Sequence, residues 1–210
     1  MIAKGSFQLI LPPFLSAILC LSLFLYTNIF IILLLSLILF LFTAFFTIFF
    51  RDPERKIGEG IVAPADGKII ELEKTEKITK ISIFMSLWDV HVNRIPLDCK
   101  VIKIVRKYGK FLPAYKKVSS YENERLELEL ETEIGAIKLT QVVGVFARRI
   151  LCYTKENEYL KKGQRFGMIR FGSRVELYLP TERTELKVKL GDRVLAGEST
   201  LAMVKARLSI

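Results

Sequence analysis

The chain has 210 residues, a hydrophobic fraction of 51% and a formal net charge of +10, a length that suits one ordinary domain with an appendage. The average hides a sharp division, because Lys4 is the only charged residue before Arg51. The basic excess comes with no nucleic-acid-binding motif, and the scattered Cys20, Cys99 and Cys152 form no CxxC pair, which argues against a zinc site or a disulfide framework.

The first 50 residues have the composition of a membrane anchor. About 20 apolar residues cross a bilayer as a helix. Leu9–Thr27 and Ile29–Phe50 are each long enough, and Asn28 is the most polar point between them, so we expect a transmembrane helical hairpin. One long tilted span after an irregular entry segment is the alternative. The apolar block is too long for a signal peptide, whose apolar region has about 7–15 residues.

Flanking cations predict the orientation of this anchor. Lys4 precedes the apolar block, and Arg51, Arg55 and Lys56 follow it. The positive-inside tendency then places both ends, and with them the soluble part, in the cytoplasm. The positive charge of the soluble part suits an anionic membrane surface, although a lysine-rich solvated surface would explain it equally simply.

Residues 51–60 contain one proline and two glycines and predict a short linker. Short β-type segments follow, separated by glycine and proline. Leu126–Glu131 and Glu185–Leu190 alternate strictly between polar and apolar residues, as a strand with one buried face requires. The predicted strands are Lys68–Leu72, Lys80–Met85, Lys100–Tyr108, Leu126–Glu131, Ala136–Val145, Gly167–Phe171, Arg174–Tyr178, Glu185–Lys189 and Leu201–Lys205.

Only one helix is expected after the anchor, at about Phe146–Leu151. Residues 61–210 therefore predict a mostly β domain, barrel-sandwich-like and with little helix, that follows the N-terminal transmembrane hairpin.

Three segments contain residues suited to chemistry. His91 is the only histidine, so any imidazole acid–base step must use it, although a structural histidine in a loop is an equally ordinary interpretation. Asp66 lies in the turn Ala63–Lys68, where it either caps its own backbone or orients an imidazole. Gly172 and Ser173 lie between two β-type segments, which alone indicates only a turn or a bulge.

Together these segments resemble the phosphatidylserine decarboxylase family in its short bacterial and archaeal form. Ala-Pro-Ala-Asp-Gly-Lys (63–68), Phe-Met-Ser…Asp-Val-His-Val-Asn-Arg (84–94) and Phe-Gly-Ser-Arg-Val-Glu-Leu-Tyr-Leu-Pro (171–180) occur in the family's order. The resemblance extends from about Ile61 to Ser199. Many relatives have Leu-Gly-Ser-Thr where this chain has Phe-Gly-Ser-Arg.

The resemblance implies a proenzyme that cuts itself between Gly172 and Ser173. The Ser173 hydroxyl would attack the Gly172 carbonyl, with His91 as the base and Asp66 holding its tautomer. Elimination of the resulting ester and hydrolysis of the dehydroalanine would release ammonia and leave a pyruvoyl cofactor at position 173. The products would be a β chain of residues 1–172 and an α chain of residues 173–210, which stay associated, and no metal is implied.

The resemblance also implies the reaction, which is the decarboxylation of a serine phospholipid to the ethanolamine phospholipid and CO2. The pyruvoyl ketone would serve as the electron sink, and His91 would also donate or relay a proton. Candidates for contact with the lipid phosphate are Arg94, Arg148, Arg149 and Arg174. The sequence leaves open whether the substrate is phosphatidylserine or archaetidylserine, and whether the protein forms a homodimer.

Two other functions are compatible with parts of the sequence. Lys189–Glu198 resembles the closing strand of biotinyl and lipoyl domains, but no Met-Lys-Met or Asp-Lys pair offers a lysine for modification. A non-catalytic membrane-tethered β scaffold is the other alternative. Both predict an intact chain, whereas a pyruvoyl enzyme would be recovered as two chains.

Overall fold

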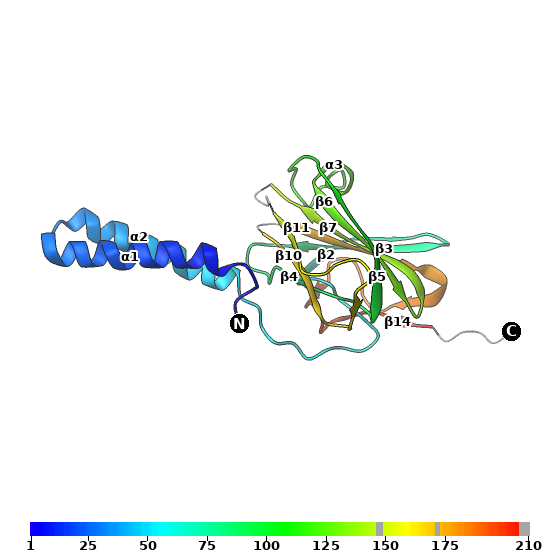
Figure 1. The fold of residues 1–210 in the computed structure, drawn as a ribbon. Coiled ribbons are helices and arrows are strands. Elements are labelled where there is room, and N and C mark those ends of the chain that lie inside the picture. Colours follow the sequence, from blue (N-terminus) through cyan, green and yellow to red (C-terminus); the bar gives the residue numbers. More distant parts are fainter. Residues whose placement is uncertain (146–148, 171–172, 206–210) are drawn as a thin grey trace. The chain divides into compact units, whose positions relative to one another are not determined.

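The computed structural model describes residues 1–145, 149–170 and 173–205 and divides into two compact units, Met1–Pro53 and Glu54–Ile210. The first unit is a hairpin of α1 (Phe7–Thr27) and α2 (Phe30–Phe49) (Figure 1). Asn28 has a left-handed φ of 55° and ends α1 by donating its backbone N–H to the Phe24 carbonyl oxygen at 2.7 Å. The predicted hairpin and its break at Asn28 are confirmed.

The two helices make contact through small residues. Ser36 Oγ donates to the Ala17 carbonyl oxygen across the hairpin at 2.9 Å, and both residues are buried. Small side chains at a crossing let two helices approach closely, and an interhelical hydrogen bond adds to that packing in an apolar surrounding. Most other side chains of the hairpin are exposed and apolar, and both helices are long and apolar enough to cross a membrane.

The second unit consists mainly of antiparallel strands. Its described residues include two short helical elements, α3 (Ser119–Glu122) and a 3-10 turn at Thr181–Arg183. The strands are β1 (Ile61–Val62), β2 (Gly67–Lys74), β3 (Ile78–Met85), β4 (Val92–Arg94), β5 (Cys99–Lys107), β6 (Arg125–Thr132), β7 (Gly135–Val143), β8 (Ile150–Cys152), β9 (Tyr159–Leu160), β10 (Arg165–Ile169), β11 (Ser173–Pro180), β12 (Thr184–Leu186), β13 (Arg193–Val194) and β14 (Thr200–Val204).

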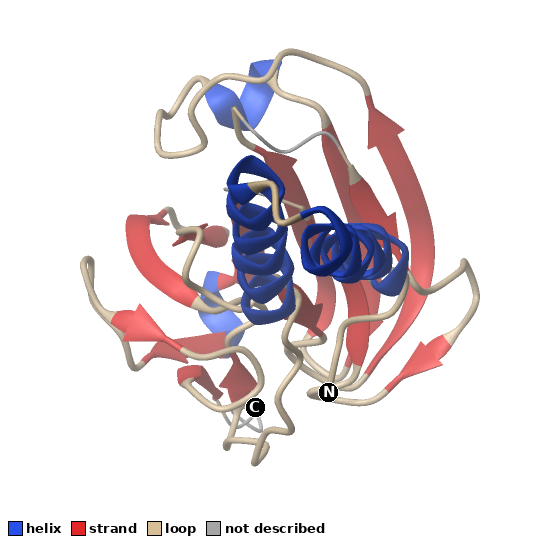
Figure 2. Ribbon diagram, turned by 90° about the vertical axis from the view of Figure 1, so that its left-hand side faces the viewer, coloured by secondary structure: helices blue, strands red, loops and turns tan. Residues whose placement is uncertain are grey.

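The largest sheet has eight strands in the order β13-β2-β3-β11-β7-β6-β5-β9. Its strands curve around a common interior (Figure 2). Two three-stranded sheets, β4-β10-β8 and β1-β14-β12, complete the unit. Strand β11 is central, so Ser173 is paired on one side with Met85 and on the other with Val143.

Alternation along the strands forms the core, as the sequence predicts. Leu126, Leu128 and Leu130 of β6 are buried in it, as are Val175 and Leu177 of β11. The mostly β class is confirmed, and each predicted strand overlaps an observed one. The helix predicted at 146–151 is wrong at its end, because Ile150–Cys152 is strand β8, hydrogen-bonded to β10. The rest of that prediction, at 146–148, lies outside the described residues.

The segment after Pro53, which the composition presents as a linker, packs on the β-rich unit. Arg55 binds Asp66 through an ion pair of 2.8 Å between Nη2 and Oδ2. Gly58 donates its backbone N–H to the Gly197 carbonyl oxygen at 2.9 Å. Backbone and side-chain bonds therefore hold this segment near the turn that contains Asp66.

Candidate active site

Ser173 begins the central strand and is fully buried. Because side chains alternate along a strand, its side chain shares the inward face with Val175 and Leu177. Its Oγ lies 3.4 Å from Met85 Sδ, on the neighbouring strand. The hydroxyl is therefore held inside the unit, at the first residue of a strand that is hydrogen-bonded on both sides. Gly172, the other residue of the predicted cleavage site, lies outside the described residues.

His91 is 1% exposed and immediately precedes β4. Its Nδ1 lies 2.8 Å from the Asp89 carbonyl oxygen. A carbonyl oxygen only accepts hydrogen bonds, so Nδ1 carries the proton and Nε2 carries the lone pair of the neutral ring. This tautomer presents Nε2 as the basic nitrogen, which suits a general base.

Asn93 connects the histidine segment to the serine. His91 lies two residues before Asn93, and its carbonyl oxygen accepts the Ile169 backbone N–H at 3.3 Å, next to the β4–β10 pairing. Asn93 Nδ2 lies 3.6 Å from Met85 Sδ, the same sulfur that Ser173 Oγ contacts. The structure thus brings the strand that follows His91 next to Ser173, with Met85 between them.

Asp66 is buried beside the histidine segment. Its Oδ1 accepts the Ala196 backbone N–H at 2.7 Å, and Arg55 binds Oδ2. Burial raises the pKa of this carboxyl group above its usual value, while the hydrogen bond from Ala196 and the charge of Arg55 oppose the shift. The backbone of Val90, the residue before His91, also lowers this pKa. A role for Asp66 in orienting His91 stays a prediction.

Sequence reasoning missed Met85, Asn93 and Gln141 as parts of this site. Gln141 Nε2 donates to Asn93 Oδ1 at 2.6 Å, and both residues are fully buried. Gln141 Oε1 has no hydrogen-bond partner among the described residues. The only signal for Gln141 was a polar residue at an inward position of an alternating strand, and nothing local linked it to Ser173.

A mostly apolar cavity of about 220 Å³ adjoins this site. Met85 lines it and also touches Ser173. The cavity lining consists of Phe84, Met85, Ser86, Leu87, Pro113, Ala114, Tyr115, Gly144 and Val145. A larger cavity of about 490 Å³ near β5 and β9 is lined by charged residues such as Asp98 and Lys100 and contains none of the predicted catalytic residues.

A known protein family matches most of this chain. A sequence profile described as phosphatidylserine decarboxylase matches residues 42–202, which include Asp66, His91 and Ser173. The chain belongs to the phosphatidylserine decarboxylase family. The match begins within α2 and continues into β14, so it takes in almost all of the β-rich unit.

Individual relatives are similar over most of their length. A phosphatidylserine decarboxylase proenzyme of Desulfotalea psychrophila is 46% identical over 77% of this chain and 80% of the relative. One of Syntrophus aciditrophicus is 45% identical over 73% of this chain and 76% of the relative. A proenzyme of Methanosarcina mazei, whose name gives archaetidylserine as the substrate, is 44% identical over 75% of this chain and 74% of the relative.

The arginines that the sequence predicts for phosphate binding differ in how exposed their side chains are to solvent. Arg174 is 1% exposed and its guanidinium binds buried carboxylates, so that assignment is wrong. Arg94 is 5% exposed and donates from Nη1 to the Gly163 carbonyl oxygen at 3.0 Å. Arg149 is exposed. Its carbonyl oxygen accepts the backbone N–H of the half-buried Arg170 at 3.2 Å, and Arg148 lies outside the described residues.

In the part of the chain that the structure describes, no group of three or more histidine, cysteine or carboxylate side chains could hold a metal ion. The polar groups that the structure connects to Ser173 are the thioether of Met85 and, through it, the side-chain amides of Asn93 and Gln141.

Proposed function

We propose that this protein is a membrane-anchored decarboxylase of a serine phospholipid that produces its own pyruvoyl cofactor by cutting the Gly172–Ser173 bond. The observation that carries the proposal is the buried Ser173 hydroxyl at the end of a central strand, beside Met85 and the strand that follows His91. Family membership and the proenzyme names of the relatives support it.

Self-cleavage begins with the Ser173 hydroxyl as nucleophile. A serine hydroxyl is a weak nucleophile until a base takes its proton. The tautomer of His91 leaves Nε2 as that base. Attack on the Gly172 carbonyl carbon converts the amide into an ester, and elimination then frees the carboxylate end of residues 1–172. Hydrolysis of the dehydroalanine releases ammonia and leaves a ketone at residue 173.

The site fits a pyruvoyl group. The group is small and uncharged, Ser173 is fully buried, and the side chain that its Oγ contacts is the uncharged thioether of Met85. Met85 of β3 and Asn93 of β4 would contact it. The pyruvoyl ketone supplies an electrophilic carbonyl for the serine amine and withdraws electrons while CO2 leaves. His91 holds the proton that the α-carbon receives.

Two parts of the protein suit the uncharged part and the phosphate of the substrate. The apolar cavity next to Met85 offers room for the uncharged part of the head group or the start of a lipid chain. Arg149 and Arg170 lie opposite each other at the end of the β8–β10 pair. Burial, and then the nearby positive charge of Arg149, lower the pKa of Arg170. A phosphate between these like charges would relieve their repulsion and accept hydrogen bonds from both.

The apolar hairpin gives this reaction its location. A phospholipid rarely leaves the bilayer, so an enzyme that acts on its head group must be held at the membrane. Helices α1 and α2 meet the length requirement for two spans. With cations at both ends of the hairpin, the β-rich unit would face the cytoplasm.

The decisive experiment is the intact mass of the purified protein and of its Ser173→Ala variant. The wild-type protein should give two chains, residues 1–172 and residues 173–210, the second with a blocked pyruvoyl end. Ser173→Ala should remain one chain, while Ser199→Ala, a matched loss of a hydroxyl group in the same fragment, should be cut normally. Cyanoborohydride and a serine phospholipid should trap an adduct on the shorter wild-type fragment. An active wild-type protein that is a single chain would refute the proposal.

A further inference from the structure

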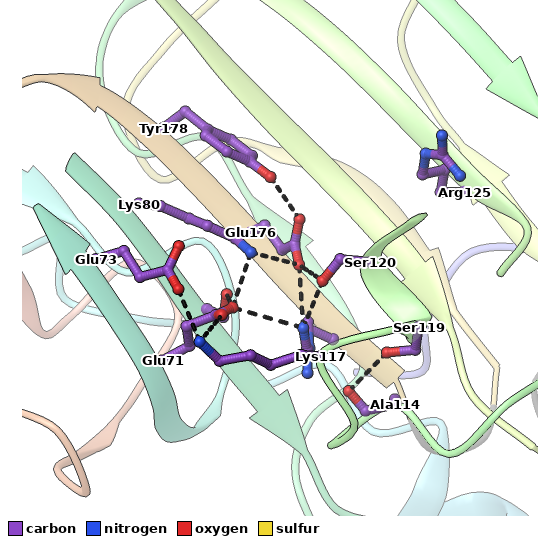
Figure 3. A network of polar contacts seen from close by, with 12 residues as sticks. Glu71, Glu73, Lys80, Ala114, Lys117, Ser119, Ser120, Arg125, Glu176 and Tyr178 are labelled. Atoms are coloured by element: carbon purple, nitrogen blue, oxygen red, sulfur yellow. Dashed lines mark hydrogen bonds and ion pairs between the residues drawn. The ribbon is translucent and has the colours of Figure 1, made fainter. Parts of the chain in front are cut away.

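A cluster of charged side chains is buried on the opposite face of the strand that begins with Ser173. Alternation points Arg174, Glu176 and Tyr178 away from the face of Ser173. Glu71 of β2 and Lys80 of β3 meet Glu176 there, with Ser120 of α3 beside them (Figure 3). Arg174 and Glu176 are each 1% exposed, and Glu71 and Lys80 are each 7% exposed.

Arg174 connects its own strand to two other parts of the unit. Its Nη1 donates to Ser120 Oγ at 2.6 Å and to Glu176 Oε1 at 3.2 Å, and it lies 3.7 Å from Glu71 Oε2. Its Nη2 donates to the Lys116 carbonyl oxygen at 3.1 Å. The guanidinium is therefore bound from three directions, by its own strand, by β2 and by the segment that contains α3.

The segment that covers Arg174 is itself fixed to the sheet. The Asn123 side chain donates from Nδ2 to the carbonyl oxygens of Leu112 and Val143, at 2.7 and 2.8 Å. Val143 is a direct strand partner of Ser173. Ser120 completes the connection, because its Oγ accepts from Arg174 and donates to Glu176 Oε1 at 2.5 Å.

These contacts matter after the chain is cut, because residue 173 is then a chain end. The inference therefore rests on the proposed function. Before cleavage, residue 173 is held by covalent bonds on both sides. Afterwards it is a chain end, and chain ends fray unless neighbouring groups hold them. Arg174 is the first residue with an intact side chain after the cut, and all its partners except Glu176 belong to residues 1–172.

We propose that Arg174 is a positioning residue, whose buried ionic contacts hold the cofactor-bearing end of residues 173–210 in the active site after self-cleavage. The network joins the two fragments through Ser120, Lys116 and Glu71 on one side and Arg174 and Glu176 on the other. Desolvation offsets much of the attraction within a buried ion pair, but the pair can fix one arrangement of the groups that it joins. A fixed arrangement is what a reactive group at a chain end requires.

This role affects the two reactions of the protein unequally. Self-cleavage takes place in a continuous chain, so loss of the Arg174 contacts should slow it less than about tenfold. Decarboxylation depends on a chain end, and a displacement of about 1 Å of a reacting group lowers the rate on the order of 100-fold. Arg174→Met should therefore lower kcat per cut molecule roughly 100-fold with a nearly unchanged KM, and Arg174→Lys should restore part of that loss.

The experiment compares full-length Arg174→Met, Arg174→Lys and Ser120→Ala in lipid nanodiscs, measuring the cleavage rate on gels and kcat and KM on a serine phospholipid. Lys187→Met is the matched control, because Lys187 also lies in residues 173–210 but, among the residues that the structure describes, its side chain pairs only with the exposed Glu185, at 2.7 Å. If Arg174→Met does not accumulate in cells, Ser120→Ala tests the positioning role instead. We expect this variant to lower kcat roughly tenfold.

The possible results separate this inference from the proposed function. An uncut wild-type protein would overturn the proposed function whatever the variants do. With a normally cut wild type, an unchanged kcat per cut molecule in Arg174→Met and Ser120→Ala would overturn the positioning role. An equal fall in cleavage and decarboxylation would overturn it too, because a general defect in folding affects both steps.

Discussion

Glu71 provides a quantitative test of the buried ionic cluster. Burial alone would raise the pKa of its carboxyl group, but hydrogen bonds from Lys80 and Ser82, together with the charges of Lys80 and Arg174, lower it from 4.5 to about 2. The donors lie at 2.8 Å and 2.9 Å from Oε2. Since the folded-state pKa is depressed, this group stabilises the fold above pH 4.5, and the stabilisation is lost as the pH falls towards about 2.

The size of the effect follows from the same shift. A change of one pKa unit corresponds to 1.36 kcal/mol, so this shift corresponds to about 3 kcal/mol at neutral pH. The side chain is only 7% exposed, and removing one partner of a buried pair has a similar cost of about 3–5 kcal/mol. We therefore expect Glu71→Gln to lower the free energy of unfolding by roughly 3 kcal/mol at about pH 7, and by less than half of that at about pH 3.

Pulse proteolysis across a urea gradient measures this free energy for the β-rich unit in the full-length protein. The comparison is made in the Ser173→Ala background, in which we expect a single chain, so that fragment dissociation does not enter. Glu185→Gln, in the exposed pair with Lys187, is the matched control and should leave the free energy of unfolding unchanged. A stability difference for Glu71→Gln that is absent at about pH 7, or equally large at about pH 3, would refute the reasoning.

Three further predictions concern the active site and the anchor. His91→Gln should slow self-cleavage by roughly 10²–10⁴-fold in a gel time course, because a general base contributes about that much; cleavage at the wild-type rate would remove His91 from the mechanism. Val145→Asp, which puts a charge at the apolar cavity, should raise KM for the lipid while leaving self-cleavage intact, and an unchanged KM would mean that the lipid does not enter there. A cysteine at Asn28 should react in intact cells with a thiol reagent that cannot cross the membrane; labelling only after lysis would contradict the proposed orientation.

Local sequence patterns were enough to predict much of the fold. The hairpin followed from two apolar segments with Asn28 between them, and the observed helices begin and end within a few residues of the expected ones. Strict alternation located β6, because a period of two is visible without knowledge of the partner strand. The same reasoning failed at Ile150–Cys152, where three residues become a strand only because β10 lies beside them.

The sequence by itself determined which residues are available for chemistry, since the chain has one histidine and a Gly-Ser pair between two β-type segments. Tertiary structure decided what surrounds them. Met85 and Gln141 contribute to the site only because β3 and β7 flank β11, a long-range pairing that no local pattern encodes.

The position of Glu71 shows the same division. Simple alternation would point Ile69 and Glu71 to the same face of β2, which would put a carboxylate in the apolar core. A register shift between these two residues turns Glu71 towards Lys80 and Arg174 instead. A bulge depends on the pairing of two strands and on the side chains that lie on each face of the sheet. Only the folded chain therefore determines where the charge of Glu71 lies.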